Sequence, residues 1–327
     1  MTTNTTIPTI TVNTQSTEEL IVAYYSLILI IVGTLFNIIT FIILCRSTFR
    51  NTKTRPTLHY MRAMAIFDIL MLYGWNLDHY LTSIYQFHIL RYSIISCRFI
   101  SFLSYFSPQS SAWLRVFVSL DRYLSLSRLH RTWFGQSKNV LIIIACIIGV
   151  LLLLNFHFFL FVCYYRTNGT ISALSWLYDI YPLWDYINLG VYNCVPFVLM
   201  VIFNCGVIYH LLRLRSTTSI QNSRIQHRSI SITLVITTSL FLFMTVPSTV
   251  AFAFFSSSDV GLLRFFDCLL YSHHILSFPL YMITFDEFRQ EFFDMLACKT
   301  NNRRVTPQAQ TGTVTQIFNI RKPVTNT

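Results

Sequence analysis

Charged residues are scarce in this chain, and the motifs that hold zinc or cut bonds inside membranes are missing. Only 11% of the 327 residues are charged and 54% are hydrophobic, whereas soluble domains contain about 25% charged residues. This composition excludes an ordinary soluble domain and indicates a membrane protein. The eight cysteines form no C-x-x-C pair, which argues against a zinc site.

Signatures of membrane enzymes and transporters are also absent. No H-E-x-x-H motif occurs, and Asp68 is the lone acid in the middle of an apolar segment, so we expect no intramembrane hydrolase and no enzyme. No internal repeat is present, and repeats are typical of secondary transporters. The net charge of +11 follows the connections between apolar segments, so it favours membrane lipid over nucleic acid as the partner.

Seven apolar segments reach the roughly 20 residues that a membrane-spanning helix needs. They lie near residues 20–45, 58–82, 97–126, 139–163, 183–212, 229–255 and 262–285. Backbone groups in lipid must be satisfied within the segment, so we expect helices. The prediction is an all-α membrane protein, a seven-transmembrane helix bundle over 20–298, with an extracellular tail at 1–19 and a disordered cytoplasmic tail at 299–327.

Basic residues gather in alternate connections between these segments, and this pattern sets the orientation. The positive-inside rule places the N-terminus outside and the C-terminus in the cytosol of a multi-pass plasma-membrane protein. Residues 1–19 lack the basic region of a signal peptide, so the first span should insert the chain. Sequons at Asn4 and Asn168 fall on the outer side, where glycosylation occurs. The basic residues are Arg46, Arg50, Lys53, Arg55, Arg122, Arg128, Arg131, Lys138, Arg213, Arg215, Arg224, Arg228, Arg289, Lys299, Arg303, Arg304, Arg321 and Lys322.

A short amphipathic segment follows the seventh span. Residues 286–293 alternate charges with aromatics, and Phe288, Phe292 and Phe293 share one helical face. This pattern predicts a short eighth helix along the inner membrane surface. Cys298 comes next and is either a palmitoylation site or a plain cytosolic cysteine.

Polar residues inside the spans fall on shared helical faces. Ser104, Ser111, Arg115 and Arg122 are spaced by 7, 4 and 7 residues, which places them on one side of the third helix. A second stripe runs along the seventh span through Asp267, Tyr271, His274, Phe278 and Tyr281. Such stripes should face the interior of a bundle, where ionisable residues mark functional sites. Adjacent His273 and His274 point to different faces, so one should line the bundle and the other should pack.

An ordered set of residues carries a family resemblance. It consists of Asn37, Ala65 with Asp68, Cys97, Trp113, Asp121-Arg122-Tyr123, Pro196, Phe241 with Pro247, and Tyr281 with Phe288. Over residues 20–298 the chain resembles rhodopsin-like G-protein-coupled receptors. Within that family it is most similar to invertebrate FMRFamide-type peptide receptors, through Ser111-Ala112-Trp113-Leu114, His157, Val195-Pro196-Phe197, Phe278-Pro279-Leu280-Tyr281 and Phe288-Arg289.

The resemblance implies a receptor that passes an extracellular signal to a heterotrimeric G protein. Asp121 would hold Arg122 at rest within the Asp121-Arg122-Tyr123 motif, and release would let the arginine meet the G protein. A phosphorylated Thr-rich tail could recruit arrestin. Cys97 should pair with a cysteine of the second outer loop. We favour Cys163, just past the fourth span, and Cys194 and Cys268 remain alternatives.

Asp68 resembles the sodium-site carboxylate of the family, and Ser111 matches a second ligand of that site. Arg115 departs from the aliphatic residue that is usual there. Because a buried unpaired arginine is untenable, we expect Arg115 to pair with Asp68 and to weaken or displace sodium. The alternative is that Arg115 reaches water or a backbone carbonyl. No other cofactor is expected.

The resemblance also places a ligand pocket between the outer halves of the spans. The expected lining residues are Asp78, His79, Ser104, Tyr105, Asn188, Tyr192, Phe252, Asp267 and Tyr271. Ser104 stands where relatives that bind amines place an aspartate, so we do not expect a biogenic amine as the ligand. The outer segments are acidic, which favours a cationic ligand such as an amidated, arginine-containing peptide. The alternative is a chemosensory or small-molecule receptor of the same fold.

Several positions depart from the family pattern. Asn37, Pro247 and Tyr281 are expected to take part in switching, but Thr245 stands where a tryptophan is usual. The proline of the seventh span, Pro279, is shifted by one position. The segment 225–228 contains no acid, whereas many relatives use an acid there to hold the arginine. We therefore expect a looser resting state with some basal activity.

Overall fold

The structure is a computed structural model. It describes residues 17–46, 49, 56–127, 136–167, 169–172, 183–217, 222–255 and 260–297. The expected modification sites Asn4, Asn168 and Cys298 lie outside these residues, as do most of the two expected tails. The side chains of Phe252 and of residues 225–228 also lie outside the description.

Every one of the seven apolar segments lies on helical structure. Four of them are single helices. The first, third and sixth segments form α1 (Thr17–Cys45), α5 (Ile94–Leu126) and α10 (Asn222–Phe255). The last is also one helix, α11 (Val260–Thr284), and α12 (Asp286–Leu296) follows it. The expected short helix after the seventh segment is thus present, and it is three residues longer than the sequence pattern indicated.

The other three segments are divided. The second consists of α2 (Thr57–Gly74) and α3 (Asn76–Tyr85), which meet at Trp75. The fourth consists of α6 (Ser137–Asn155) and α7 (His157–Leu160). The fifth begins with α8 (Leu183–Asn188), widens into a π-helical turn, η4 (Leu189–Cys194), and continues as α9 (Val195–Thr217). Such π-turns often occur at functional sites.

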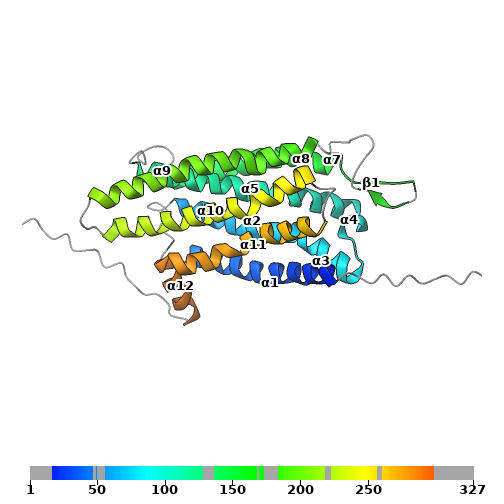
Figure 1. Cartoon of the computed structure of the whole chain (residues 1–327), viewed down its shortest axis with the longest axis horizontal. Coiled ribbons are helices and arrows are strands. Elements are labelled where there is room, and N and C mark those ends of the chain that lie inside the picture. The colour runs from blue at the N-terminus through cyan, green and yellow to red at the C-terminus, as the bar shows by residue number, and fades with distance from the viewer. Residues whose placement is uncertain are drawn as a thin grey trace, which may run out of the picture.

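The long helices lie side by side and form an elongated bundle (Figure 1). One end carries the short helix α4 (Ile89–Tyr92) and an antiparallel hairpin of β1 (Tyr164–Tyr165) and β2 (Ile171–Ser172), and we call it the hairpin end. At the other end α12 turns away from α11. The helix α5 packs against α2, α6, α9 and α10, so it holds a central position in the bundle.

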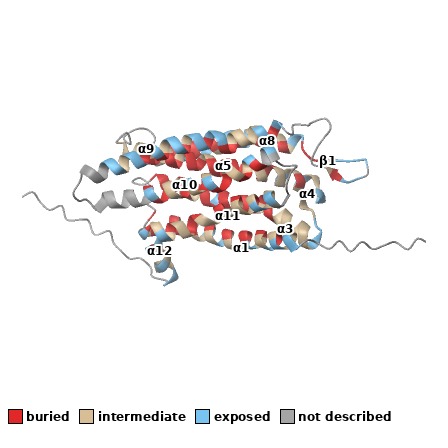
Figure 2. Cartoon of the chain, viewed as in Figure 1, coloured by how far each residue is buried: buried red, intermediate tan, exposed pale blue. Residues whose placement is uncertain are grey.

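Among the residues that the structure describes, four helical stretches are long and apolar enough to cross a membrane, which fits an all-α membrane protein. They are Thr17–Cys45, Ser137–Leu160, Tyr186–Arg213 and Ser231–Ala251. Exposed positions occur along the long helices (Figure 2). The distribution of side chains agrees with a membrane protein, because many of the exposed residues are large and apolar. Leu153 and Phe243 are each 73% exposed. A water-soluble surface rarely exposes so much apolar area.

A disulfide and an arginine fasten the hairpin end. Cys97, near the start of α5, is bonded to Cys163, which lies directly before β1. This is the partner that we favoured over Cys194 and Cys268, both of which are free. Next to the disulfide, the Arg98 Nε donates to the carbonyl of Val162 at 3.0 Å. The segment between α7 and β1 is therefore held against α5.

Candidate functional site

A pocket of about 290 Å³ opens between the helices toward the hairpin end. We call it the interhelical pocket. The wall from α5 contains Ser104, Tyr105 and Pro108, and the wall from α8 and η4 contains Asn188, Leu189 and Tyr192. The remaining lining residues are Met71, Trp75, Ser248, Thr249, Asp267, Leu270 and Tyr271. Five segments that are distant in sequence thus meet around one space.

Six of the nine residues expected at a ligand pocket line this one. They are Ser104, Tyr105, Asn188, Tyr192, Asp267 and Tyr271. Asp78 does not line the pocket. Its carboxylate accepts hydrogen bonds from the backbone N–H groups of Ile89 and Leu90, at 2.9 and 3.4 Å, and so holds the start of α4. His79 stacks on Trp75 at 4.5 Å between ring centroids.

Trp75 is the most informative lining residue that the sequence did not single out. Its ring lies between those of His79 and Tyr271, and the Tyr271 stack has a centroid distance of 5.6 Å. The break between α2 and α3 falls at this residue. The spacing of polar residues could not predict that Trp75 lines the pocket, because its position depends on the break between α2 and α3.

Asp267 is the acid of the interhelical pocket. It is 7% exposed, and it has no hydrogen bond or ion pair to any residue that the structure describes. A carboxylate in this position has a strong electrostatic preference for a cationic or hydrogen-bond-donating partner. Tyr192 and Ser248 add hydroxyl oxygens that also have no partner among the described residues. The pocket therefore presents polar groups that a ligand or water can satisfy.

A chain of buried amides supports the pocket wall from behind. The side chain of Gln109 on α5 donates to the side-chain oxygen Oδ1 of Asn188 at 2.9 Å and accepts from the side chain of Asn155 of α6 at 2.7 Å. Gln109 and Asn155 are fully buried. Buried hydrogen-bonded networks of this kind rigidify the elements that they join. Three helices are thereby fixed relative to one another next to the pocket.

One to two turns further along α5, a buried ionic cluster surrounds Asp68. The Arg115 Nη2 donates to the two carboxylate oxygens of Asp68 at 3.0 and 3.2 Å. The Ser111 hydroxyl donates to Oδ1 of Asp68 at 2.7 Å, and Arg115 in turn donates to Ser111. Asp68 is 1% exposed and Arg115 is 3% exposed. The predicted pairing of Arg115 with Asp68 is thus present in the structure.

His274 is a third member of this Asp68 cluster. Its Nδ1 lies 2.8 Å from Oδ1 of Asp68, so the ring donates to the carboxylate. The Asn37 side chain donates to the His274 carbonyl at 2.9 Å and to that of Gly33 at the same distance. The sequence placed His274 on the interior stripe of the seventh segment but gave it no partner. The cluster joins α1, α2, α5 and α11.

Aromatic rings close the other side of the cluster. The Arg115 guanidinium carbon lies 5.0 Å from the centroid of the Phe241 ring on α10, a distance typical of a cation–π contact. His273 packs edge-on against the same ring at 5.3 Å. Both nitrogens of His273 lack a partner among the described residues. Both histidines are buried in the bundle, and their ring centroids are 5.5 Å apart, so they do not occupy opposite faces of α11.

The Asp121-Arg122-Tyr123 motif lies toward the α12 end of α5. The Arg122 Nη2 donates to Oδ2 of Asp121 at 2.7 Å, and the hydroxyl of Thr57 at the start of α2 donates to the same oxygen. Arg122 is only 4% exposed. The arginine is therefore held within the bundle.

Tyr123 packs against α9 through a close approach at a glycine. A Cβ atom built on Gly206 would lie 2.6 Å from two ring carbons of Tyr123. The ring also lies near Phe203 and His210, at centroid distances of 6.2 and 5.8 Å. Gly206 is thus the residue that allows the two helices to meet around this ring.

The remaining expected switch residues lie in α10 and α11. Pro247 is within α10, where it removes one backbone donor from the helix. Thr245, at the position where a tryptophan is usual in the family, is fully buried and donates to the Phe241 carbonyl at 2.7 Å. Tyr281 is 3% exposed and packs on Phe288 of α12 at 5.5 Å. The Thr245 bond thus lies within α10, whereas the Tyr281 contact joins α11 to α12.

A single helix joins all three levels of the site. Ser104 lines the interhelical pocket, Arg115 belongs to the Asp68 cluster, and Arg122 is bonded to Asp121. At about 1.5 Å per residue, Ser104 and Arg122 are about 27 Å apart along α5. The polar face predicted from their spacing therefore connects the pocket with the opposite end of the bundle.

Neither protein-family models nor curated proteins give a match to this chain.

Proposed function

We propose that this chain is a seven-span receptor of the rhodopsin-like type, which binds an extracellular ligand and activates a heterotrimeric G protein. The observation that carries the proposal is the arrangement along α5. This helix is joined at Cys97 to the segment before the hairpin, lines the interhelical pocket, contributes Arg115 to the Asp68 cluster, and ends near the bonded pair Asp121–Arg122. A ligand site and a candidate coupling site thus share one rigid element.

Seven spans are supported by helix length as well as by apolar composition. The helices α5 and α11 have 33 and 25 residues, or about 50 and 37 Å, against a hydrocarbon core of roughly 30 Å. Together with α2, these helices carry Asp68, Arg115 and His274. Such residues lower the mean hydropathy of a helix, but here they face one another inside the bundle. Their helices can therefore meet lipid with their other faces.

The orientation follows from the distribution of basic residues. In this proposal the hairpin end faces outward at the plasma membrane, and the α12 end faces the cytosol. The interhelical pocket is then open to an extracellular ligand. Arg122 lies on the side where a G protein binds, and arrestin binds on the same side after phosphorylation of the tail.

The proposed ligand is a cationic or amidated peptide whose terminal group enters the interhelical pocket. Asp267 supplies the negative charge, and the stacked rings of Trp75 and Tyr271 supply an aromatic wall. A guanidinium can satisfy both kinds of partner at once. The rest of the peptide would lie outside, because about 290 Å³ holds only a small part of a peptide.

That same volume is the observation that favours the second candidate, a chemosensory or small-molecule receptor of the same fold. Drug-sized ligands occupy pockets of about 300–1,000 Å³, and the interhelical pocket is close to the lower limit. A compact polar molecule is of a size that suits this volume. The coupling mechanism would be the same for both ligand classes.

In this mechanism, the ligand stabilises one of two arrangements of the bundle. A ligand can shift the equilibrium only by its difference in affinity for the two arrangements. The Asp68 cluster lies between the pocket and Arg122 and joins four helices. A ligand that moves α5 or α11 therefore changes the geometry of the cluster, and α5 conveys the change to Arg122.

A sodium ion, which the family resemblance implies, does not fit the residues around Asp68. Both carboxylate oxygens already accept hydrogen bonds from Arg115, and Oδ1 also accepts from Ser111 and His274. The guanidinium supplies the positive charge that a sodium ion would provide. We therefore propose that the receptor works without a sodium cofactor.

The test is a calcium or cyclic-nucleotide readout in cells that express the receptor, challenged with a library of amidated neuropeptides. The Arg122→Ala variant is measured alongside, with surface expression of both forms quantified. We expect a peptide to elicit a response that Arg122→Ala loses. A library of small polar molecules and odorants is applied in the same assay, and a response to these alone would favour the second candidate. Silence to both libraries from well-expressed receptor would contradict the proposal.

A further inference from the structure

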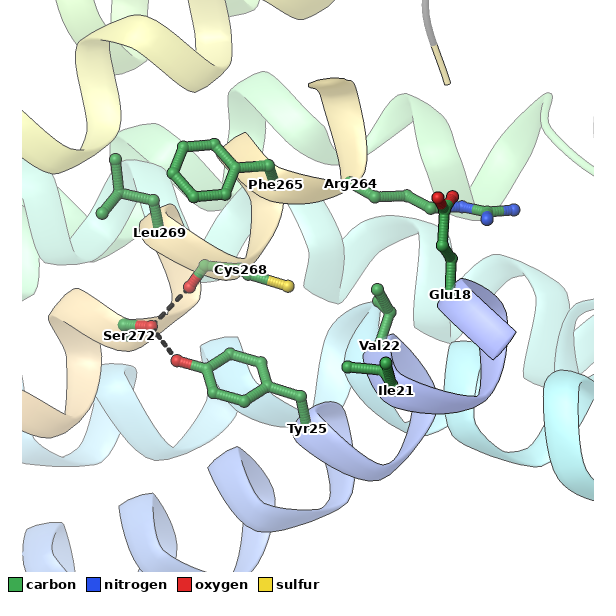
Figure 3. Close-up of a pocket in the computed structure, with 9 residues that line it drawn as sticks. All are labelled: Glu18, Ile21, Val22, Tyr25, Arg264, Phe265, Cys268, Leu269 and Ser272. Atoms are coloured by element: carbon green, nitrogen blue, oxygen red, sulfur yellow. Dashed lines mark hydrogen bonds between the residues drawn. The ribbon is translucent and has the colours of Figure 1, made fainter. Parts of the chain in front are cut away.

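In their halves nearest the hairpin end, the helices α1 and α11 are tied together at two levels and separated between them. Near the hairpin end, the Arg264 Nη2 donates to Glu19 at 2.8 Å. About 9 Å further along α1, the Tyr25 hydroxyl lies 2.5 Å from that of Ser272. Between these two ties is a cavity of about 580 Å³ that opens to the outside of the bundle (Figure 3). We call this space the α1–α11 groove.

The walls of the α1–α11 groove are mostly apolar. Val22 lines it from α1 and Leu269 from α11, and both are partly buried. At its edges, Ile21 and Phe265 are 63% and 62% exposed. Water in such a space would find few hydrogen-bonding partners, and an empty space would forfeit dispersion contacts. The groove is therefore suited to a flexible hydrocarbon chain.

The rim of the groove carries charges of both signs. Arg264 keeps 24% of its side chain exposed while it pairs with Glu19. Glu18 also lines the groove and has no hydrogen bond or ion pair to the described part of the chain. One guanidinium and two carboxylates thus meet at the mouth. This arrangement complements a head group with a phosphate and an ammonium, and it disfavours a purely anionic head group.

The floor of the groove offers no free hydroxyl hydrogen. Ser272 donates its hydrogen to the Cys268 carbonyl at 2.5 Å, so the Tyr25 hydroxyl must donate to Ser272 (Figure 3). Both hydrogens are consumed by these two bonds. A phosphate or an ester carbonyl would find no donor there, so the head group of an amphiphile belongs at the rim and its chain belongs below.

We infer that the α1–α11 groove binds a zwitterionic membrane phospholipid. Its phosphate pairs with Arg264, its ammonium faces Glu18, and one acyl chain lies between Val22 and Leu269. The inference rests on the membrane insertion in the proposed function but not on ligand recognition or G-protein coupling. The bound lipid fills the space between the first and the last long helix of the bundle.

The test is native mass spectrometry of the full-length protein with palmitoyl-oleoyl phosphatidylcholine. The wild type should retain one lipid, and Val22→Trp or Leu269→Trp should reduce the retained fraction at least tenfold, because the indole occupies the groove. Leu153→Trp is the matched control: Leu153 is 73% exposed on α6 and does not line the groove. Equal retention by the wild type and by either groove variant that folds would overturn the inference.

Head-group selectivity and the reactivity of Cys268 provide two independent readouts. Phosphatidylglycerol should be retained at least fivefold less than phosphatidylcholine, and Glu18→Gln should reduce that difference. Cys268 is a free thiol that lines the groove. Its alkylation by N-ethylmaleimide, followed by peptide mass spectrometry, should be slower in phosphatidylcholine nanodiscs than in phosphatidylglycerol nanodiscs. Equal retention of the two lipids with equal alkylation rates would overturn the head-group assignment.

These measurements do not depend on signalling. If the receptor responds to a ligand but retains no lipid, only the present inference fails. If lipid is retained as expected but no ligand elicits a G-protein response, only the proposed receptor function fails.

Discussion

Arg115 of α5 and Asp68 of α2 form a salt bridge at 3.0 Å in the middle of the bundle, where both side chains are at least 96% buried. In this position an internal guanidinium neutralises a carboxylate that is flanked by Ser111 and His274. The pair is close to the interhelical pocket along α5 and shares that helix with Arg122. Several properties of the protein should therefore depend on it.

Removing one member of this pair should destabilise the protein more than removing both. Asp68→Leu leaves a buried guanidinium uncompensated, which typically costs about 3–5 kcal/mol. The double variant Asp68→Leu/Arg115→Leu removes both charges, so its thermal unfolding midpoint should lie above those of both single variants. The midpoints are measured on purified protein in one detergent. A double variant as unstable as the sum of the single variants would show that the two residues are energetically independent.

Sodium should have no effect on ligand binding to the wild type, because Arg115 supplies the cation. In Arg115→Leu the carboxylate of Asp68 keeps Ser111 and His274 but loses its guanidinium, so sodium-sensitive binding should appear. Radioligand binding is compared in sodium chloride and in N-methylglucamine chloride at equal ionic strength. A sodium response that is the same in the wild type and in Arg115→Leu would contradict this expectation.

Weakening the hold on Arg122 should raise signalling without ligand. Asp121→Asn replaces a charge-assisted bond of about 1.5–3 kcal/mol with a weaker one, and a change of about 1.4 kcal/mol alters an equilibrium constant tenfold. Thr57→Val removes only the neutral bond to Asp121, so its effect should be smaller. Ligand-free second-messenger levels are compared at equal surface expression. The wild type itself should exceed mock-transfected cells, since 225–228 contains no acid. Equal levels in mock, wild-type and Asp121→Asn cells would rule out this account.

Asp267 and Asp78 should differ in their effect on a cationic ligand. Asp267→Asn removes the charge that faces the interhelical pocket, so the potency of an arginine-containing peptide should fall at least tenfold. Asp78 uses its carboxylate to accept two backbone N–H groups. Asp78→Asn retains an acceptor oxygen, so potency should change less than threefold. Concentration–response curves for the two variants decide between these roles, and equal losses would contradict the assignment.

Two glycines offer a matched test of helix packing. Gly206→Ala places a methyl group 2.6 Å from the ring of Tyr123, so the ring or α9 must shift and the unfolding midpoint should fall. Gly149→Ala lies within α6, where a Cβ meets nothing within 4 Å. This change should stabilise the protein by about 0.5–1 kcal/mol through helix propensity. A Gly206→Ala variant as stable as Gly149→Ala would show that Tyr123 relaxes at no cost.

Much of the fold could be predicted from the sequence because lipid imposes a simple rule. A segment of 20 apolar residues must satisfy its own backbone, so each of the seven segments became helical. The polar spacing along the third segment also placed Ser104, Arg115 and Arg122 on one interior face. The pairing of Arg115 with Asp68 could be predicted because no other acid occurs in the middle of a span.

Other features depended on contacts between distant segments, and only the tertiary structure decided them. His274 reaches Asp68 across 206 residues, and Gln109 links Asn155 to Asn188. Trp75 lines the interhelical pocket because the helix breaks there, whereas Asp78 turns to the backbone of α4. Periodicity determines which face of a helix is buried. It does not determine which side chain of another helix lies opposite, because that depends on how the helices cross and where they break.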